Sequence, residues 1–132
     1  MKVVNGTWKL NVAKSKYTPD PPPKSATITY EETVDGIKRT GGSVDAEGKT
    51  TPFEYTAKYD GKDYPVTGPD LYDAITIKRI DDQTAESTLK KSGKAVGNAQ
   101  RVVSKDGKVL TLTITGTNSK GEKMHNVAVY EK

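Results

Sequence analysis

Short turn-forming pairs interrupt this chain at near-regular intervals. They are Asp35-Gly36, Glu47-Gly48, Asp60-Gly61, Asp81-Asp82, Ser92-Gly93, Asp106-Gly107 and Lys120-Gly121. Glycine adopts positive φ at little steric cost, which is what a tight hairpin turn requires. A chain that turns this often has no room for long helices. The spacing therefore predicts a series of antiparallel hairpins.

The segments between the turns alternate apolar and polar residues, as half-buried strands do. Leu110, Leu112 and Ile114 share one face of their segment, and threonines occupy the other. Composition agrees, with 17 Thr and 12 Val against 5 Leu, because β-branched residues suit a pleated surface. The predicted strands are 6–13, 25–34, 37–44, 50–58, 62–66, 71–80, 84–91, 95–104, 109–117 and 123–131.

A length of 132 residues suits one domain, spanning residues 1–132. About ten strands, each with one apolar face, hide that face best by closing on themselves, which also removes exposed sheet edges. The expected fold class is therefore all-β, a single antiparallel up-and-down β-barrel of about ten strands. A two-sheet sandwich is the alternative.

Residues 14–24 (KSKYTPDPPPK) carry four prolines and show no alternation. Proline fixes φ and cannot donate to a strand ladder, so this segment is predicted to be an extended link without helix. It would cross one end of the barrel between the first two strands. The alternative interpretation is a docking site for a partner that recognises PxxP-like segments.

Several classes of protein are excluded or not expected. The chain has no cysteine, so disulfide scaffolds, zinc ribbons and thiol catalysis are ruled out. No apolar run is long enough to predict a membrane span, and residues 1–5 lack the apolar core of a signal peptide. The net charge of +4 is scattered, so no nucleic-acid partner is expected. A monomer is expected, and a barrel without cysteine favours a secreted or periplasmic compartment.

The segment Gly6-Thr7-Trp8-Lys9-Leu10, together with Val129-Tyr130-Glu131 near the end, resembles the calycins. This superfamily comprises lipocalins and fatty-acid-binding proteins, and the length suits the fatty-acid-binding branch or small bacterial lipocalin-like relatives. The resemblance implies a ligand-binding barrel in which Gly6 and Trp8 close the base and are structural.

Two features depart from the fatty-acid-binding pattern. That pattern has a helix-turn-helix lid between the first two strands, where this chain has its proline-rich link, so no helical lid is expected. The pattern also has Arg-x-Tyr on the last strand to clamp a fatty carboxylate. The matching residues here are Ala128-Val129-Tyr130, so Tyr130 fits the pattern and the arginine is absent.

Two arginines are candidate ligand receptors. Arg39 shares a strand face with Ile37, and Arg79 shares one with Ile75 and Ile77. A cation on an apolar face is costly unless it is paired or solvated, and a guanidinium binds a carboxylate through two parallel hydrogen bonds. The alternative is that both lie near strand ends and extend to the barrel rim.

Tyr30, Tyr55 and Tyr130 would supply hydroxyl groups to the same ligand. The expected function is non-catalytic binding of a small, partly apolar ligand in the barrel interior, with a carboxylate as one option for its polar group. The alternative is a structural or protein-interaction barrel with a filled core.

Enzymatic activity is not expected, because no nucleophile–base pair is apparent. Neither a metal site nor a cofactor is expected, since His125 is the only histidine. A haem barrel of the nitrobindin type, which pairs a Gly-x-Trp strand with a histidine ligand, is a further and less favoured alternative.

Overall fold

Twelve short β-strands and one 3-10 turn make up the computed structural model, which describes residues 4–19, 21–34, 36–68, 72–117 and 120–132. The 3-10 turn η1 is Val12–Lys14. The strands are β1 Gly6–Leu10, β2 Lys16–Thr18, β3 Ser25–Glu32, β4 Gly36–Val44, β5 Thr50–Pro52, β6 Glu54–Lys58, β7 Tyr64–Thr67, β8 Ala74–Arg79, β9 Thr84–Lys91, β10 Lys94–Val103, β11 Val109–Thr117 and β12 Lys123–Glu131.

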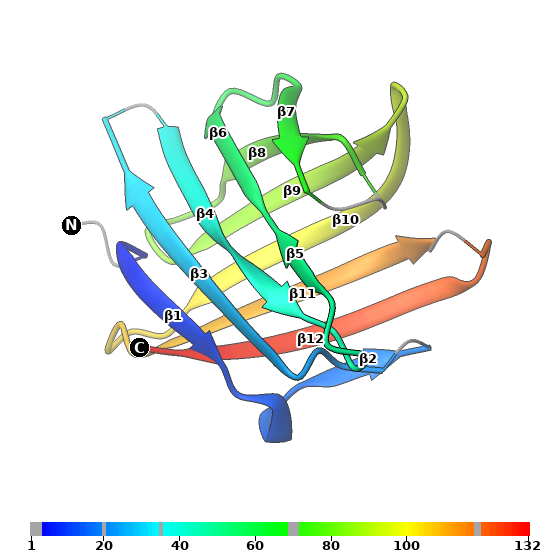
Figure 1. The fold of residues 1–132 in the computed structure, drawn as a ribbon. Coiled ribbons are helices and arrows are strands. Elements are labelled where there is room, and N and C mark those ends of the chain that lie inside the picture. The colour runs from blue at the N-terminus through cyan, green and yellow to red at the C-terminus, as the bar shows by residue number, and fades with distance from the viewer. Residues whose placement is uncertain (1–3, 20, 35, 69–71, 118–119) are drawn as a thin grey trace.

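Ten of these strands form a closed antiparallel barrel (Figure 1). Around the ring the order is β1, β3, β4, β6, β7, β8, β9, β10, β11 and β12, and β12 returns to β1 through the pair Leu10↔Tyr130. Each barrel strand pairs with the barrel strand that follows it in the chain, and the closing pair of β12 with β1 is the exception. The short strands β2 and β5 lie outside this ring. The predicted fold class, an all-β up-and-down barrel of about ten strands without a helical lid, is confirmed.

Several strand limits differ from the prediction by a few residues, and two of these differences have a clear local cause. The predicted strand 6–13 ends at Leu10, because Asn11 caps η1 and its side chain accepts a hydrogen bond from the Lys14 N–H. The predicted strand 50–58 is interrupted at Phe53, whose N–H donates to the Gly41 carbonyl over 3.0 Å. Gly41 has a φ of +140°, and a Cβ there would lie 2.2 Å from the Thr27 carbonyl oxygen, so only glycine fits this bend.

The proline-rich link contains a short strand that the sequence pattern does not predict. β2 pairs with the first half of β12, through Tyr17↔Asn126 and Thr18↔His125. β1 pairs with β12 only near its end, through Lys9↔Glu131 and Leu10↔Tyr130, so β2 covers a part of β12 that β1 leaves open. No α-helix lies in the described part of the link, as expected.

The two ends of the barrel differ. At the base lie the starts of β1 and β4, the ends of β8 and β12, and both ends of the described chain (Figure 1). Trp8 is completely buried, its indole N–H donates to the Val4 carbonyl over 2.9 Å, and the Lys132 amine lies 4.9 Å from its ring centroid. At the opposite end, the mouth, lie the proline-rich link and the β4–β5 turn (Figure 1).

Candidate functional site

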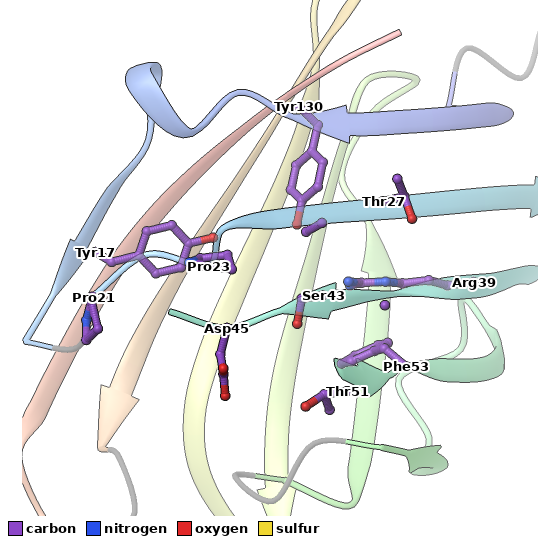
Figure 2. A pocket seen from close by; sticks show the side chains of 12 residues that line it. Tyr17, Pro21, Pro23, Thr27, Arg39, Ser43, Asp45, Thr51, Phe53 and Tyr130 are labelled. Atoms are coloured by element: carbon purple, nitrogen blue, oxygen red, sulfur yellow. The ribbon is translucent and has the colours of Figure 1, made fainter. Parts of the chain in front are cut away.

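A cavity of about 300 Å³ opens at the mouth of the barrel, beneath the proline-rich link (Figure 2). We call it the mouth pocket. Its walls combine aromatic rings and prolines with a few polar groups. The lining residues are Tyr17, Pro21, Pro23, Ala26, Thr27, Arg39, Gly42, Ser43, Asp45, Thr51, Phe53 and Tyr130.

Strand register places Arg39 inside the barrel. On β4 it lies directly opposite Tyr30 of β3 and Tyr55 of β6. Directly opposed residues share a face of the sheet, and both tyrosines are buried, so all three side chains point inward. The guanidinium carbon lies 3.9 Å from the Phe53 ring centroid and 5.9 Å from that of Tyr30. A cation–π contact of this kind holds the guanidinium against the Phe53 ring (Figure 2).

The Nε–H group of Arg39 is buried and has no hydrogen-bond partner. A buried donor without an acceptor costs free energy, and native proteins rarely leave one unsatisfied. Within the described part of the chain, no carboxylate lies within ion-pair distance of Arg39. Burial lowers the pKa of Arg39 and nearby tyrosines, Tyr30 foremost, raise it by more, so the side chain stays charged. Arg39 therefore offers an unused positive donor to an incoming anion.

Beyond Arg39 the barrel interior narrows to a chamber of about 30 Å³, which we call the inner chamber. This is close to the volume that one water molecule occupies in the liquid. Arg39 and Arg101 of β10 both line it. Arg101 donates through Nη2 to the Tyr59 hydroxyl over 2.9 Å, and its guanidinium carbon lies 5.0 Å from the Tyr30 ring centroid.

Buried tyrosines surround the two arginines. Burial raises the pKa values of Tyr55, Tyr72 and Tyr130 well above their ordinary value of 10.0, although Arg39 lowers each of them somewhat. These hydroxyl groups therefore remain protonated at neutral pH. Each can donate a hydrogen bond to a negatively charged group.

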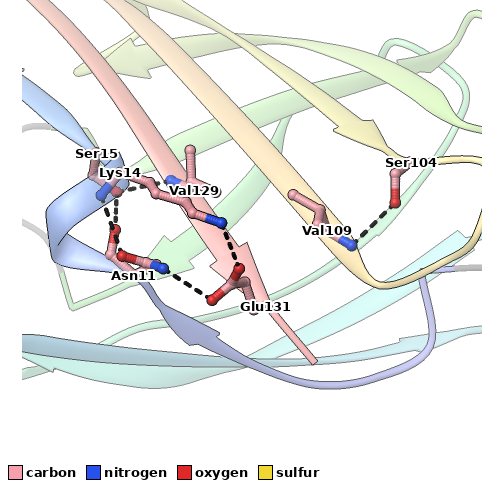
Figure 3. Close-up of polar contacts among 7 residues, drawn as sticks. All are labelled: Asn11, Lys14, Ser15, Ser104, Val109, Val129 and Glu131. Carbon is pink, nitrogen blue, oxygen red and sulfur yellow. Dashed lines mark hydrogen bonds and ion pairs between the residues drawn. The ribbon is translucent and has the colours of Figure 1, made fainter.

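A polar corner anchors the start of the link (Figure 3), two residues before Tyr17, which lines the mouth pocket (Figure 2). The Ser15 hydroxyl donates to the Asn11 carbonyl over 2.7 Å and accepts the Val129 N–H over 2.9 Å. Asn11 and Lys14 both bind the Glu131 carboxylate, at 2.9 and 3.2 Å. These bonds join η1 to the last barrel strand, β12. After η1 the chain continues through β2 and the prolines across the mouth.

The structure brings together four of the five residues predicted to contact ligand. Tyr30, Arg39 and Tyr55 are neighbours in the interior, and Tyr130 lines the mouth pocket with Arg39. Arg79 lies apart from them, exposed at the base end of β8.

Arg79 has partners of its own. Its guanidinium pairs with the Glu32 carboxylate and lies 4.6 Å from the Tyr59 ring centroid. Arg79 is thus a rim residue, which was the alternative interpretation for both arginines. Alternation along a strand indicates which face a residue takes, but not how far along the barrel axis it lies.

Sequence reasoning missed Arg101, Phe53 and Tyr17. Arg101 alternates with Ala99 and Val103, the same signal that singled out Arg39, so the pattern could have found it. Phe53 and Tyr17 reach the pocket because of the strand break and the β2 pairing, and no local pattern predicts either.

His125 is exposed on β12 opposite Thr18, and it lines neither the mouth pocket nor the inner chamber. Among the residues that the structure describes, no three His, Cys, Asp or Glu side chains gather as metal ligands would. In the same ranges, no helix has the length and apolar character needed to cross a bilayer.

Comparison with protein-family models, with curated proteins and with solved structures finds no match to this chain. The closed antiparallel ten-stranded barrel is consistent with a calycin-like fold.

Proposed function

We propose that this protein is a calycin-like binding protein whose mouth pocket holds one small amphipathic carboxylate without chemically changing it. The observation that carries this proposal is the buried Nε–H of Arg39, a charged donor without a partner beside an aromatic-lined cavity of about 300 Å³. A carboxylate would satisfy that donor and neutralise the charge in one step.

The lining suits the two halves of such a ligand. A guanidinium donates two parallel hydrogen bonds to a carboxylate, and the neutral Tyr130 hydroxyl adds a third donor. The apolar part would lie against Phe53, Pro21 and Pro23. A volume of about 300 Å³ holds roughly ten water-sized groups, which favours a short or medium-length acid over a long-chain fatty acid.

The resemblance to calycins supports a carrier of carboxylates. In the fatty-acid-binding pattern one strand supplies both members of the Arg-x-Tyr clamp. Here Tyr130 on β12 and Arg39 on β4 line the same pocket, so two strands would supply the same pair of groups.

The lining gives little support to catalysis. Asp45 is the only carboxylate among the described lining residues, and one of its oxygens accepts the N–H groups of Glu47 and Lys49, each over 2.9 Å. A carboxylate engaged in a turn in this way is poorly placed to act as a general base.

A structural barrel with no small-molecule ligand is the second candidate. The observation that favours it is the small inner chamber of about 30 Å³, around which buried side chains occupy the interior. In that case the mouth pocket would be a surface hollow without a ligand.

Calorimetric titration with hexanoate, octanoate and decanoate, each beside its primary amide, tests the proposal. We expect the carboxylates to bind more tightly than the amides. Arg39→Met should weaken carboxylate binding by roughly ten- to a hundredfold, the loss of one charge-assisted contact of about 1.5–3 kcal/mol.

Lys38→Met is the matched control. It removes the same charge from the next residue of β4, which is exposed on the outer face, and should leave the affinity unchanged. If no probe binds the wild-type protein, the structural barrel is the better account. If Arg39→Met binds octanoate as tightly as the wild-type protein does, the role given to Arg39 is wrong.

A further inference from the structure

Two positively charged side chains line the inner chamber from opposite walls of the barrel. In the ring of ten strands, β4 and β10 are separated by five steps in either direction, so Arg39 and Arg101 project from facing sides. Both line the chamber of about 30 Å³, and both guanidiniums pack near the Tyr30 ring.

No negative charge offsets them. Of the described residues that line the chamber, Arg39 and Arg101 are the only ones with an ionised side chain at neutral pH. Glu32 is engaged by Arg79 at the base, and Asp45 is engaged by its own turn. Like charges in a poorly hydrated interior repel strongly, because little water is present to screen them.

The chamber also offers hydrogen-bond donors of the right kind. The Nε–H of Arg39 has no partner, and Tyr55 and Tyr72, which also line the chamber, keep neutral hydroxyl groups. Its volume of about 30 Å³ has room for a water molecule or for an ion of similar size.

We propose that the inner chamber binds one compact monovalent anion of about the size of chloride, held between Arg39 and Arg101. Arg39 lines both cavities, so this anion and the carboxylate proposed for the mouth pocket would compete for its one unpartnered Nε–H, and each proposal has its own test. The anion would be a resident part of the folded protein, whose charge offsets the repulsion between the two guanidiniums.

Crystals of the wild-type protein grown in sodium bromide test this directly, because bromide scatters anomalously. We expect an anomalous peak in the inner chamber, within hydrogen-bond distance of both guanidiniums. A chamber that holds only water, or bromide peaks confined to the outer surface, would overturn the proposal.

Thermal unfolding provides a second readout in solution. An anion bound only by the folded state raises Tm as its concentration rises. We expect sodium chloride to raise Tm more than sodium gluconate does at equal ionic strength, because gluconate is too large for the chamber. Arg101→Met should remove this difference, and Lys38→Met should preserve it.

Equal Tm values in the two salts would contradict a site of this size, as would a chloride-specific rise that persists in Arg101→Met. If Arg101→Met does not fold, the wild-type comparison of the two salts and the bromide crystals still decide the question.

Discussion

Trp8 on β1 and Arg39 on β4 both point into the barrel, and their surroundings differ in one chemical respect. The only polar atom of the Trp8 side chain has a partner, the Val4 carbonyl, and the Lys132 amine lies near its ring. The Nε–H of Arg39 has none. A satisfied buried group stabilises the fold, whereas an unsatisfied one favours whatever ligand completes it.

Replacing Trp8 with alanine should lower the free energy of unfolding by about 3–5 kcal/mol, as for other buried aromatic residues. The completely buried ring would leave a cavity at the base, and the Val4 carbonyl would lose its donor. Denaturant unfolding measures the change. A loss below about 1 kcal/mol would mean that Trp8 is not part of the packed base.

Three buried tyrosines make stability depend on alkaline pH. The pKa values of Tyr55, Tyr72 and Tyr130 are raised in the folded state above their ordinary value of 10.0, so folding favours their neutral form. Their contribution is fully present below about pH 10 and is lost as the pH rises further toward the folded-state values. Tyrosinate absorbance and circular dichroism, followed together, should show these residues ionising only as the barrel unfolds. Ionisation near pH 10 in a folded barrel would contradict this.

Among the elements, the barrel strands could be predicted from the sequence because turns and alternation are local signals. The segments 84–91, 109–117 and 123–131 match β9, β11 and β12 to the residue. The pairing of β2 with β12 could not be predicted, because it joins residues more than a hundred positions apart. The mouth pocket depends on that pairing and on the break at Phe53, so its position was not predictable either.

The candidate site was predictable in part, because alternation along a strand is a local signal. Alternation identified Tyr30, Arg39 and Tyr55 as inward-facing, and register then brought them together. It could not distinguish the middle of a strand from its end, which is why Arg79 was grouped with them.

The link should depend on the Ser15 hydroxyl, which connects η1 to β12 (Figure 3). Ser15→Ala leaves the Val129 N–H without its acceptor and should cost about 1–2 kcal/mol. Hydrogen exchange should become faster at Val129 and Tyr17, with little change in β8 and β9.

Ser104→Ala is the matched control for this change. The Ser104 hydroxyl accepts the Val109 N–H over 3.1 Å in the β10–β11 turn at the base, outside the link (Figure 3). Val109 lies opposite Glu131 in the sheet, so this change removes a similar bond close to the corner but not one made by the link. Its loss should speed up exchange at Val109 and leave the link unaffected. If Ser15→Ala leaves exchange in the link unchanged, the corner does not anchor it.

The whole molecule is a closed sheet with a packed base and a charged interior that opens at one end. Closure pairs the first barrel strand with the last, so both edges of the sheet have hydrogen-bond partners. The same closure encloses the apolar face of each strand, which gives a chain rich in threonine and poor in leucine its core. It also encloses Arg39 and Arg101, which no carboxylate from the described part of the barrel neutralises. The binding of anions is the property that this arrangement favours.

The most direct measurement follows the arginine Nε–H signals by nuclear magnetic resonance while octanoate or octanamide is added. The Arg39 signal is assigned by its absence in Arg39→Met. We predict that octanoate shifts this signal in proportion to the bound fraction and that octanamide does not shift it. An Arg39 signal that stays in place at saturating octanoate, or that the amide shifts equally, would contradict carboxylate binding at Arg39.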